Sequence, residues 1–176
     1  MRPLRLAAVL LLLFATASHG AAPSTPRVGI KVLPFTGFVF PHQDISGDPP
    51  GPALGVGLEI HYLPRTSFVL DLSQSFHRDL KVSSLQLLAR RRFDTRPWVL
   101  FAQAGAGGYQ AEVEGDRQFG GPGLSVGGGV EVPVGGALSL QLEGRSNWAK
   151  GFASVGNDTG WIGHTQALLW VVYKLP

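Results

Sequence analysis

Residues 138–148 show a clear alternation of apolar and polar side chains. The apolar parity holds Leu138, Leu140 and Leu142, and the polar parity holds Ser139, Gln141, Glu143, Arg145 and Asn147. Successive side chains of a β-strand point to opposite faces, whereas a helix would scatter these residues around its circumference. The period of two therefore predicts a strand with one apolar face and one charged face.

The same period recurs along most of the chain and predicts eight strands of about ten residues or more. The strands are separated by long loops expected at 41–52, 112–121 and 150–163, by a polar reversal at 77–81, and by tight turns at 63–66, 94–97 and 133–136. Pro34 predicts a bulge or a break in the pairing of the first strand. Antiparallel neighbours joined by tight turns at one end and long loops at the other are typical of an all-β, up-and-down barrel.

Most charged side chains of the predicted strands fall on the polar parity. The charged and polar residues expected to form one face are Lys31, Glu59, His61, Asp71, Gln86, Arg90, Arg92, Gln103, Glu131, Glu143 and Arg145. A soluble barrel would expose this parity to water and bury the apolar one, as in a periplasmic, lipocalin-like carrier of a lipophilic ligand. A membrane barrel would turn the apolar parity to lipid and keep these polar residues inside as a network.

Three features favour the transmembrane barrel. The apolar segments match the 9–11 residues that a tilted strand needs to cross a bilayer. Glycines recur on the polar parity, where they leave room inside a narrow barrel for long charged side chains. Aromatic residues recur near segment ends, as an interfacial girdle requires, at Tyr62, Phe93, Trp98, Trp148 and Tyr173. Because an unpaired buried charge is costly, the interior acids and bases are expected to pair.

Arg91 departs from this pattern because it stands on the apolar parity. It lies near the end of a predicted strand, where a long cation can snorkel to the interface or touch a lipid head group.

Residues 1–22 are expected to be a secretory signal peptide, and 23–176 the barrel domain. Arg2 and Arg5 precede an apolar run that is too short for a good spanning helix. Two of the 15 basic residues lie in this segment, so 13 remain against 12 acidic ones, and nothing suggests a nucleic-acid partner. The chain has no cysteine, which excludes disulfides and thiolate chemistry and suits a bacterial envelope.

Three stretches carry a more specific pattern: 96–109, where Ala and Gly alternate after an aromatic start, Gly127-Gly128-Gly129-Val130-Glu131, and 138–145. Together they resemble the eight-stranded OmpA-like outer-membrane β-barrels, over nearly the whole predicted mature chain. The resemblance implies a bacterial outer-membrane location, contact with outer-membrane lipid and insertion by the outer-membrane assembly machinery. Such barrels typically end in an aromatic residue; here Leu175 takes that place and Pro176 follows it, which is a departure.

Few residues suggest a cofactor or metal site. His61 shares its parity with Glu59 and is expected to join the interior network rather than act as a base. His77 and His164 have no carboxylate or cysteine at ligand spacing, so neither a metal nor a cofactor site is predicted. The glycines of 120–129 lack the Lys-Ser/Thr ending of a phosphate loop.

One enzymatic alternative comes from Ser146 and the downstream Asp158. Their surroundings are faintly similar to the His-x-Ser-Asn-Ala stretch and acid of outer-membrane lipid A deacylases. Gly144 stands where that motif has its histidine, so Ser146 would lack a base.

The sequence therefore predicts a non-enzymatic integral outer-membrane barrel whose interior is filled by polar side chains. Its role is expected to be structural, or adhesive through an extracellular ligand bound by 41–52, 112–121 and 150–163, because loops carry function more often than scaffolds do. A filled interior argues against a wide ion pore. The soluble carrier and the deacylase are the alternatives.

Overall fold

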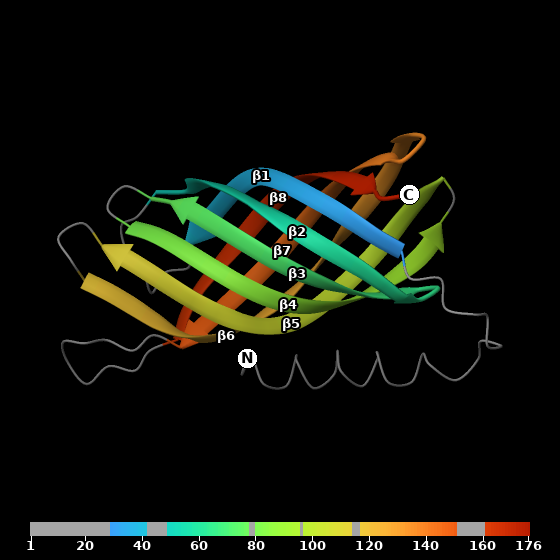
Figure 1. The fold of residues 1–176 in the computed structure, drawn as a ribbon. Coiled ribbons are helices and arrows are strands. Elements are labelled where there is room, and N and C mark those ends of the chain that lie inside the picture. The colour runs from blue at the N-terminus through green and yellow to red at the C-terminus, as the bar shows by residue number, and fades with distance from the viewer. Residues whose placement is uncertain (1–28, 42–48, 78–79, 96, 114–116, 151–160) are drawn as a thin grey trace.

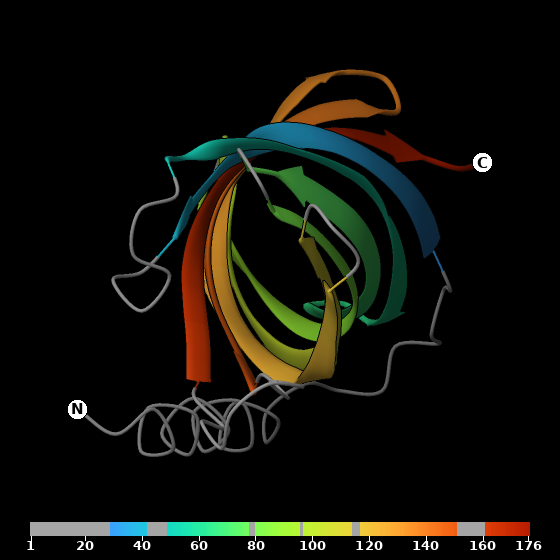
Figure 2. The ribbon, with the colours of Figure 1, turned by 90° about the vertical axis from the view of Figure 1, so that its left-hand side faces the viewer.

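The computed structural model describes residues 29–41, 49–77, 80–95, 97–113, 117–150 and 161–176, which form a closed barrel (Figures 1 and 2). Its eight strands are β1 (Gly29–Pro41), β2 (Gly51–Leu63), β3 (Thr66–Phe76), β4 (Leu80–Thr95), β5 (Trp98–Val113), β6 (Arg117–Gly135), β7 (Leu138–Lys150) and β8 (Trp161–Lys174). Within these residues, no helix is long and apolar enough to cross a membrane. The predicted signal peptide lies outside the described residues and stays a prediction.

Each strand pairs antiparallel with the next, and β1 pairs with β8 to close the barrel. The predicted up-and-down topology is therefore confirmed. The β1–β8 pairs on either side of Pro34, Val32 with Tyr173 and Phe35 with Trp170, keep one register, while Leu33 and Pro34 form no pair with β8. Pro34 thus interrupts this pairing without a bulge, because it has no backbone N–H to donate.

The tight turns and the long connections lie at opposite ends of the barrel. We call these the turn end, where β2 connects to β3, β4 to β5 and β6 to β7, and the loop end. At the turn end, Gly136 adopts φ +56°, a conformation that favours glycine. The three turns were predicted at these places, and only the strand boundaries differ.

The strands reach further into the predicted loops than composition indicated. Gly51 and Pro52 already belong to β2, β6 begins at Arg117 inside the predicted loop 112–121, and β8 begins at Trp161 inside 150–163. The polar reversal at 77–81 is likewise shortened by the start of β4 at Leu80. Cross-strand partners explain the difference, since Gly121 pairs with Tyr109 and Gly51 with Val39 despite their loop-like composition. Residues 42–48, 78–79, 114–116 and 151–160 of these connections lie outside the described residues.

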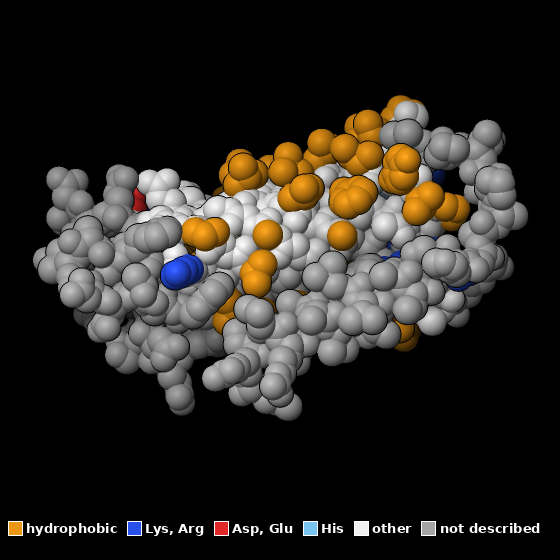
Figure 3. Space-filling model, turned by 90° about the horizontal axis from the view of Figure 1, so that it is seen from below, with side chains coloured by type: hydrophobic (Ala, Val, Ile, Leu, Met, Phe, Trp, Pro, Cys, Tyr) orange, Lys and Arg blue, Asp and Glu red, His pale blue; other side chains and the backbone are white. Residues whose placement is uncertain are grey.

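The barrel has an apolar outside and a largely polar inside. Leu58, Leu140 and Leu142 are 38%, 41% and 59% exposed, whereas Glu59 and Glu143 are 0% and 2% exposed. Figure 3 shows apolar side chains gathered over the visible barrel wall. This is the reverse of what a soluble carrier of a lipophilic ligand needs, and it matches a transmembrane barrel.

Part of the interior is nevertheless apolar, which the alternation of apolar and polar residues did not predict. A cluster fills the sector beneath β8, β1 and β2: Leu33, Phe35, Val39, Ala53, Leu168, Trp170 and Val172. The rings of Phe35 and Trp170 lie 4.2 Å apart. A Cβ at Gly55 would lie 2.5 Å from the Phe35 ring, so no larger side chain fits there, and a Cβ at Gly57 would lie 3.1 Å from the Trp170 ring, a tight contact. Packing, rather than charge, therefore closes this side of the lumen.

Candidate functional site

The polar residues predicted for the interior all lie on the inner face of the barrel. The structure places Lys31, Glu59, Asp71, Gln86, Arg90, Arg92, Gln103, Glu131, Glu143 and Arg145 in buried positions, with His61 half-buried. Each comes from a strand whose opposite face carries apolar residues, so the pleat alone turns them inward. Eight of them form a continuous series of ion pairs, here called the charge ladder.

The charge ladder begins near the turn end. Lys31 Nζ lies 2.9 Å from Glu131 Oε1, and Arg92 Nη1 lies 2.8 Å from Glu131 Oε2. Arg92 Nη2 then reaches Glu59 Oε2 at 2.9 Å. Ser67 also donates a hydrogen bond to Glu59. Positive and negative groups therefore alternate from β1 through β6 and β4 to β2.

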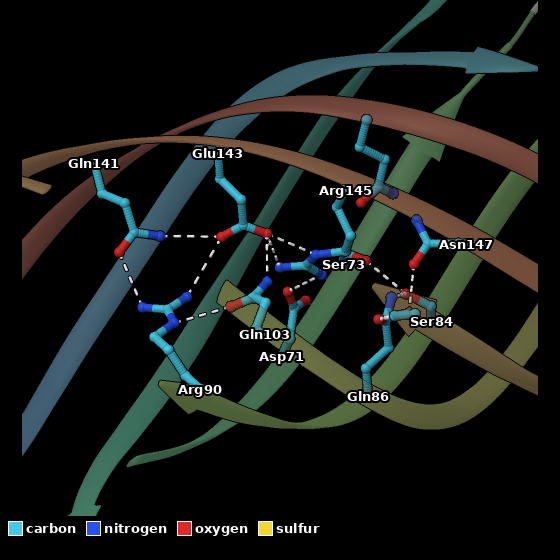
Figure 4. A network of polar contacts seen from close by, with 12 residues as sticks. Asp71, Ser73, Ser84, Gln86, Arg90, Gln103, Gln141, Glu143, Arg145 and Asn147 are labelled. Carbon is cyan, nitrogen blue, oxygen red and sulfur yellow. Dashed lines mark hydrogen bonds and ion pairs between the residues drawn. The ribbon is translucent and has the colours of Figure 1, made fainter. Parts of the chain in front are cut away.

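Arg90 joins this first part to the rest of the ladder. Its Nη1 lies 3.3 Å from Glu59 Oε2, and its Nη2 lies 3.4 Å from Glu143 Oε2. Its Nε and Nη1 donate to the side-chain oxygens of Gln103 and Gln141, both at 2.9 Å (Figure 4). These contacts use most of the guanidinium donors of a side chain that is fully buried.

The ladder ends near the middle of the barrel. Arg145 Nη2 lies 2.6 Å from Glu143 Oε1, and its Nη1 lies 2.6 Å from Asp71 Oδ2 (Figure 4). The complete order is Lys31, Glu131, Arg92, Glu59, Arg90, Glu143, Arg145 and Asp71. Four cations thus alternate with four carboxylates, so the buried charge is balanced, as burial requires.

Aromatic rings hold two of the arginines in place. The guanidinium carbon of Arg90 lies 4.3 Å from the centre of the Phe101 ring, and that of Arg145 lies 5.6 Å from Trp170. Both distances suit cation–π contact. Each ring lies on the strand next to that of its arginine, Phe101 on β5 beside β4 and Trp170 on β8 beside β7. The sequence placed both rings on the inward parity, but it did not give the register that brings each one to its arginine.

His61 lies beside the ladder without extending it. Its Nε2 is 3.6 Å from Glu59 Oε1, a carboxylate that already serves Arg90 and Arg92. His61 therefore lies next to the interior network, and its Nε2 makes no hydrogen bond to the described residues.

Towards the loop end, the inward side chains that the structure describes include no lysine, arginine, aspartate or glutamate. Here hydroxyl, amide and imidazole groups form a second network: Ser73, Ser84, Gln86, Tyr109, Ser125, Asn147, His164 and Gln166. Tyr109 donates a hydrogen bond of 3.0 Å to Asn147 Oδ1, and Asn147 Nδ2 lies 3.1 Å from His164 Nε2. Apart from Gln86, sequence reasoning missed this network. Serine and asparagine on the inward parity were its only signal.

The arrangement of side chains gives little support to the deacylase alternative. Ser146 lies on the outer face of β7, 3.2 Å from Thr165 Oγ1 of β8. Asp158 lies outside the described residues. Across the described part of the chain, no group of three or more His, Asp or Glu side chains is arranged to hold a metal ion. The arrangement inside the barrel can fill and seal a lumen, but it does not assemble a nucleophile, a base and an open site.

Comparisons with known proteins agree with this geometry. Neither a protein-family model nor a curated protein sequence matches the chain. Among solved structures, Neisserial surface protein A is similar with a TM-score of 0.70 and 18% identity, over 83% of this chain and 97% of that one. The N-terminal β-barrel domain of OprF from Pseudomonas aeruginosa gives a TM-score of 0.62 and 12% identity, over 86% and 100% of the two chains.

A third neighbour is the attachment invasion locus protein Ail of Yersinia pestis. It has a TM-score of 0.52 and 15% identity, over 86% of this chain and all (100%) of that one. Ail has also been crystallised in complex with the heparin analogue sucrose octasulfate. The neighbours are bacterial outer-membrane barrels, so the predicted fold and the predicted resemblance are confirmed. This chain has the fold of the small eight-stranded β-barrels of the bacterial outer membrane.

Proposed function

We propose that this protein is a non-enzymatic integral outer-membrane barrel that binds an extracellular ligand or surface at its loop end. The observation that carries the proposal is the balanced charge ladder, which occupies the lumen between Lys31 and Asp71. A lumen closed by paired, buried side chains gives a poor path for solutes. Any binding activity is therefore expected on the surface outside the barrel wall.

The long connections supply that surface. In membrane barrels of this kind, short turns face the periplasm and longer loops face outwards. The segments 41–52, 112–121 and 150–163 belong to the loop end, and loops on a rigid scaffold are common sites of recognition. That Ail was crystallised with a heparin analogue makes sulfated polysaccharide a first ligand to test.

Assembly of the barrel by the outer-membrane machinery is part of this proposal. Tyr173, near the end of β8, is 48% exposed on the outer face, and the backbone N–H of Leu175 donates to the carbonyl of Ile30. The terminal strand therefore presents an aromatic side chain outwards close to the point where the barrel closes.

Loop replacement tests the proposed role. Variants in which 42–48 or 151–160 is replaced by a short Gly/Ser linker should still migrate as folded barrels on unheated gels, but should lose binding of producing cells to immobilised heparin or to host cells. The matched control inserts the same linker into the turn at 136–137 of the opposite end. Normal binding by both loop variants would contradict the adhesive role and favour a structural one.

A further inference from the structure

The pairing between β1 and β8, which closes the barrel, is interrupted within the wall (Figure 1). The register skips Leu33 and Pro34 and is regular on both sides of them. Among the strand pairs that the structure describes, the two other irregularities, in β2–β3 and in β6–β7, lie directly beside a tight turn. The closing seam is therefore the described pair whose ladder breaks away from a turn.

The interruption amounts to one missing backbone hydrogen bond. The N–H of Leu175 donates to the carbonyl of Ile30 on β1. Because peptide groups along a strand point alternately to its two neighbours, Val171 also directs its N–H and its carbonyl at β1. The register on either side places Pro34 opposite Val171. Since proline has no N–H, the carbonyl of Val171 lacks its donor on β1.

The surroundings of the gap do not replace this donor. Pro34 and Val171 lie on the lipid face, where Val171 is 41% exposed, and acyl chains offer no hydrogen bond to a backbone carbonyl. On the inner face the same level holds Leu33 and Val172, which belong to the apolar cluster and are 0% and 1% exposed. All four side chains at the gap are apolar, so none of them can donate to the carbonyl.

Opening the wall at this level costs less than opening it beside the charge ladder. Acyl chains are as apolar as Leu33 and Val172, so lipid can contact these side chains without an electrostatic penalty. In the β6–β7 pair, by contrast, Gly129 lies opposite Glu143, whose carboxylate is paired with Arg145 inside the barrel. Separating those strands would bring lipid to a buried charge, which is expensive.

We propose that the β1–β8 seam opens locally at Pro34 while the neighbouring β7–β8 pair stays closed. Opening separates Leu33 and Pro34 from Val171 and Val172, and it begins at the carbonyl that lacks a donor. Pro34 thus makes the closing seam the labile part of the barrel wall. This inference concerns the wall and is independent of the ligand proposed for the loops.

Amide hydrogen exchange, measured by NMR on the folded full-length barrel in nanodiscs, tests the proposal within a single strand. The N–H groups of Val171 and Tyr173 point to β1, and those of Trp170 and Val172 point to β7. The amides that face β1 should exchange at least about tenfold faster than those that face β7, a factor that corresponds to about one backbone hydrogen bond. Equal protection of the four amides would overturn the proposal.

A proline substitution tests the cause. Pro34→Val restores an N–H opposite Val171 and keeps an apolar side chain on the lipid face, so it should slow exchange of Val171 and Tyr173 about tenfold. The matched control is Pro52→Val, because Pro52 is also an exposed strand proline but lies on β2, which does not pair with β8.

Pro52→Val should leave the exchange of Val171 and Tyr173 unchanged. Unchanged exchange in Pro34→Val, or an equal slowing in Pro52→Val, would show that Pro34 does not set the opening and would refute the proposal. If Pro34→Val does not fold, the comparison of the four amides in the wild type decides alone.

Discussion

Replacing Arg90 by Met should divide the charge ladder into two unequal parts. The turn-end part keeps two cations and two carboxylates, namely Lys31, Glu131, Arg92 and Glu59. The other part keeps one cation for two carboxylates, namely Arg145, Glu143 and Asp71. The cost of the substitution should therefore arise in the second part, where one arginine must serve two buried acids.

The magnitude follows from the burial of these groups. Arg90 is 0% exposed and contributes two ion pairs and two hydrogen bonds to glutamine side chains. Removing one partner from a buried pair costs about 3–5 kcal/mol, because a buried charge is left without compensation. Met restores much of the volume, so cavity formation adds little. We expect Arg90→Met to lower the free energy of unfolding by about 3–5 kcal/mol.

A second substitution can restore the balance, and its position matters. Glu143→Gln in the Arg90→Met background leaves Arg145 paired with Asp71 at 2.6 Å and the turn-end part untouched. Glu59→Gln in the same background leaves two cations for one carboxylate at the turn end and does not relieve the other part. The two carboxylates lie 3.4 Å and 3.3 Å from Arg90, so they are closely matched controls.

The assay is urea unfolding of the barrel in vesicles of short-chain phosphatidylcholine, followed by tryptophan fluorescence and by the gel shift of unheated samples. The double variant Arg90→Met/Glu143→Gln should be at least about 2 kcal/mol more stable than Arg90→Met alone, a coupling typical of groups in one network. Arg90→Met/Glu59→Gln should be no more stable than Arg90→Met. Equal rescue by both would show that the net charge of the lumen, rather than the order of contacts, determines stability, and would refute the reasoning.

Three further predictions concern the wall and the lumen. Leu140→Arg should lower stability in the bilayer, by up to about 2–4 kcal/mol for a cation at the midplane, measured by the inserted fraction in vesicles; insertion as complete as in the wild type would contradict the assigned faces. Gly129→Val should block folding, because a Cβ there would lie 2.0 Å from the carbonyl oxygen of Leu142, whereas Gly144→Val, where a Cβ meets nothing within 4 Å, should fold normally on gels. Planar-bilayer recordings of the wild type should show no conductance of the size of a water-filled porin channel, and such a channel would contradict the sealed lumen.

The alternation of side chains was sufficient to predict the strands and their faces. The stretch 138–148 is β7, with Leu140 outside and Glu143 inside, as a period of two requires. Strand ends were less predictable, because residues such as Gly121 favour loops by composition and pair only because a partner strand lies beside them. Local propensity depends on the residue and its neighbours in sequence, whereas pairing depends on the strands that lie beside it in the fold.

The partners within the interior could not be read from the sequence. Lys31 and Glu131 are 100 residues apart, and Asp71 and Arg145 are 74 apart. Their pairing depends on the register of every strand between them and on the tilt that barrel closure imposes. The sequence indicated a near balance of acids and bases, but many pairings satisfy that balance. The strict alternation along the ladder appears only once the barrel is closed.

The two halves of the interior differ in how much stability a single substitution costs. This difference bears on which end of the barrel can carry the proposed function. In the charge ladder, loss of one group leaves a buried charge uncompensated, which costs several kcal/mol. In the network near the loop end, loss of a group such as Ser125 or Asn147 removes neutral hydrogen bonds, at about 1–3 kcal/mol. The half that is sensitive to single changes therefore lies at the turn end, and the more adaptable half lies beneath the loops. Changes beneath the loops that are proposed to bind a ligand should therefore cost the barrel less stability than changes in the charge ladder.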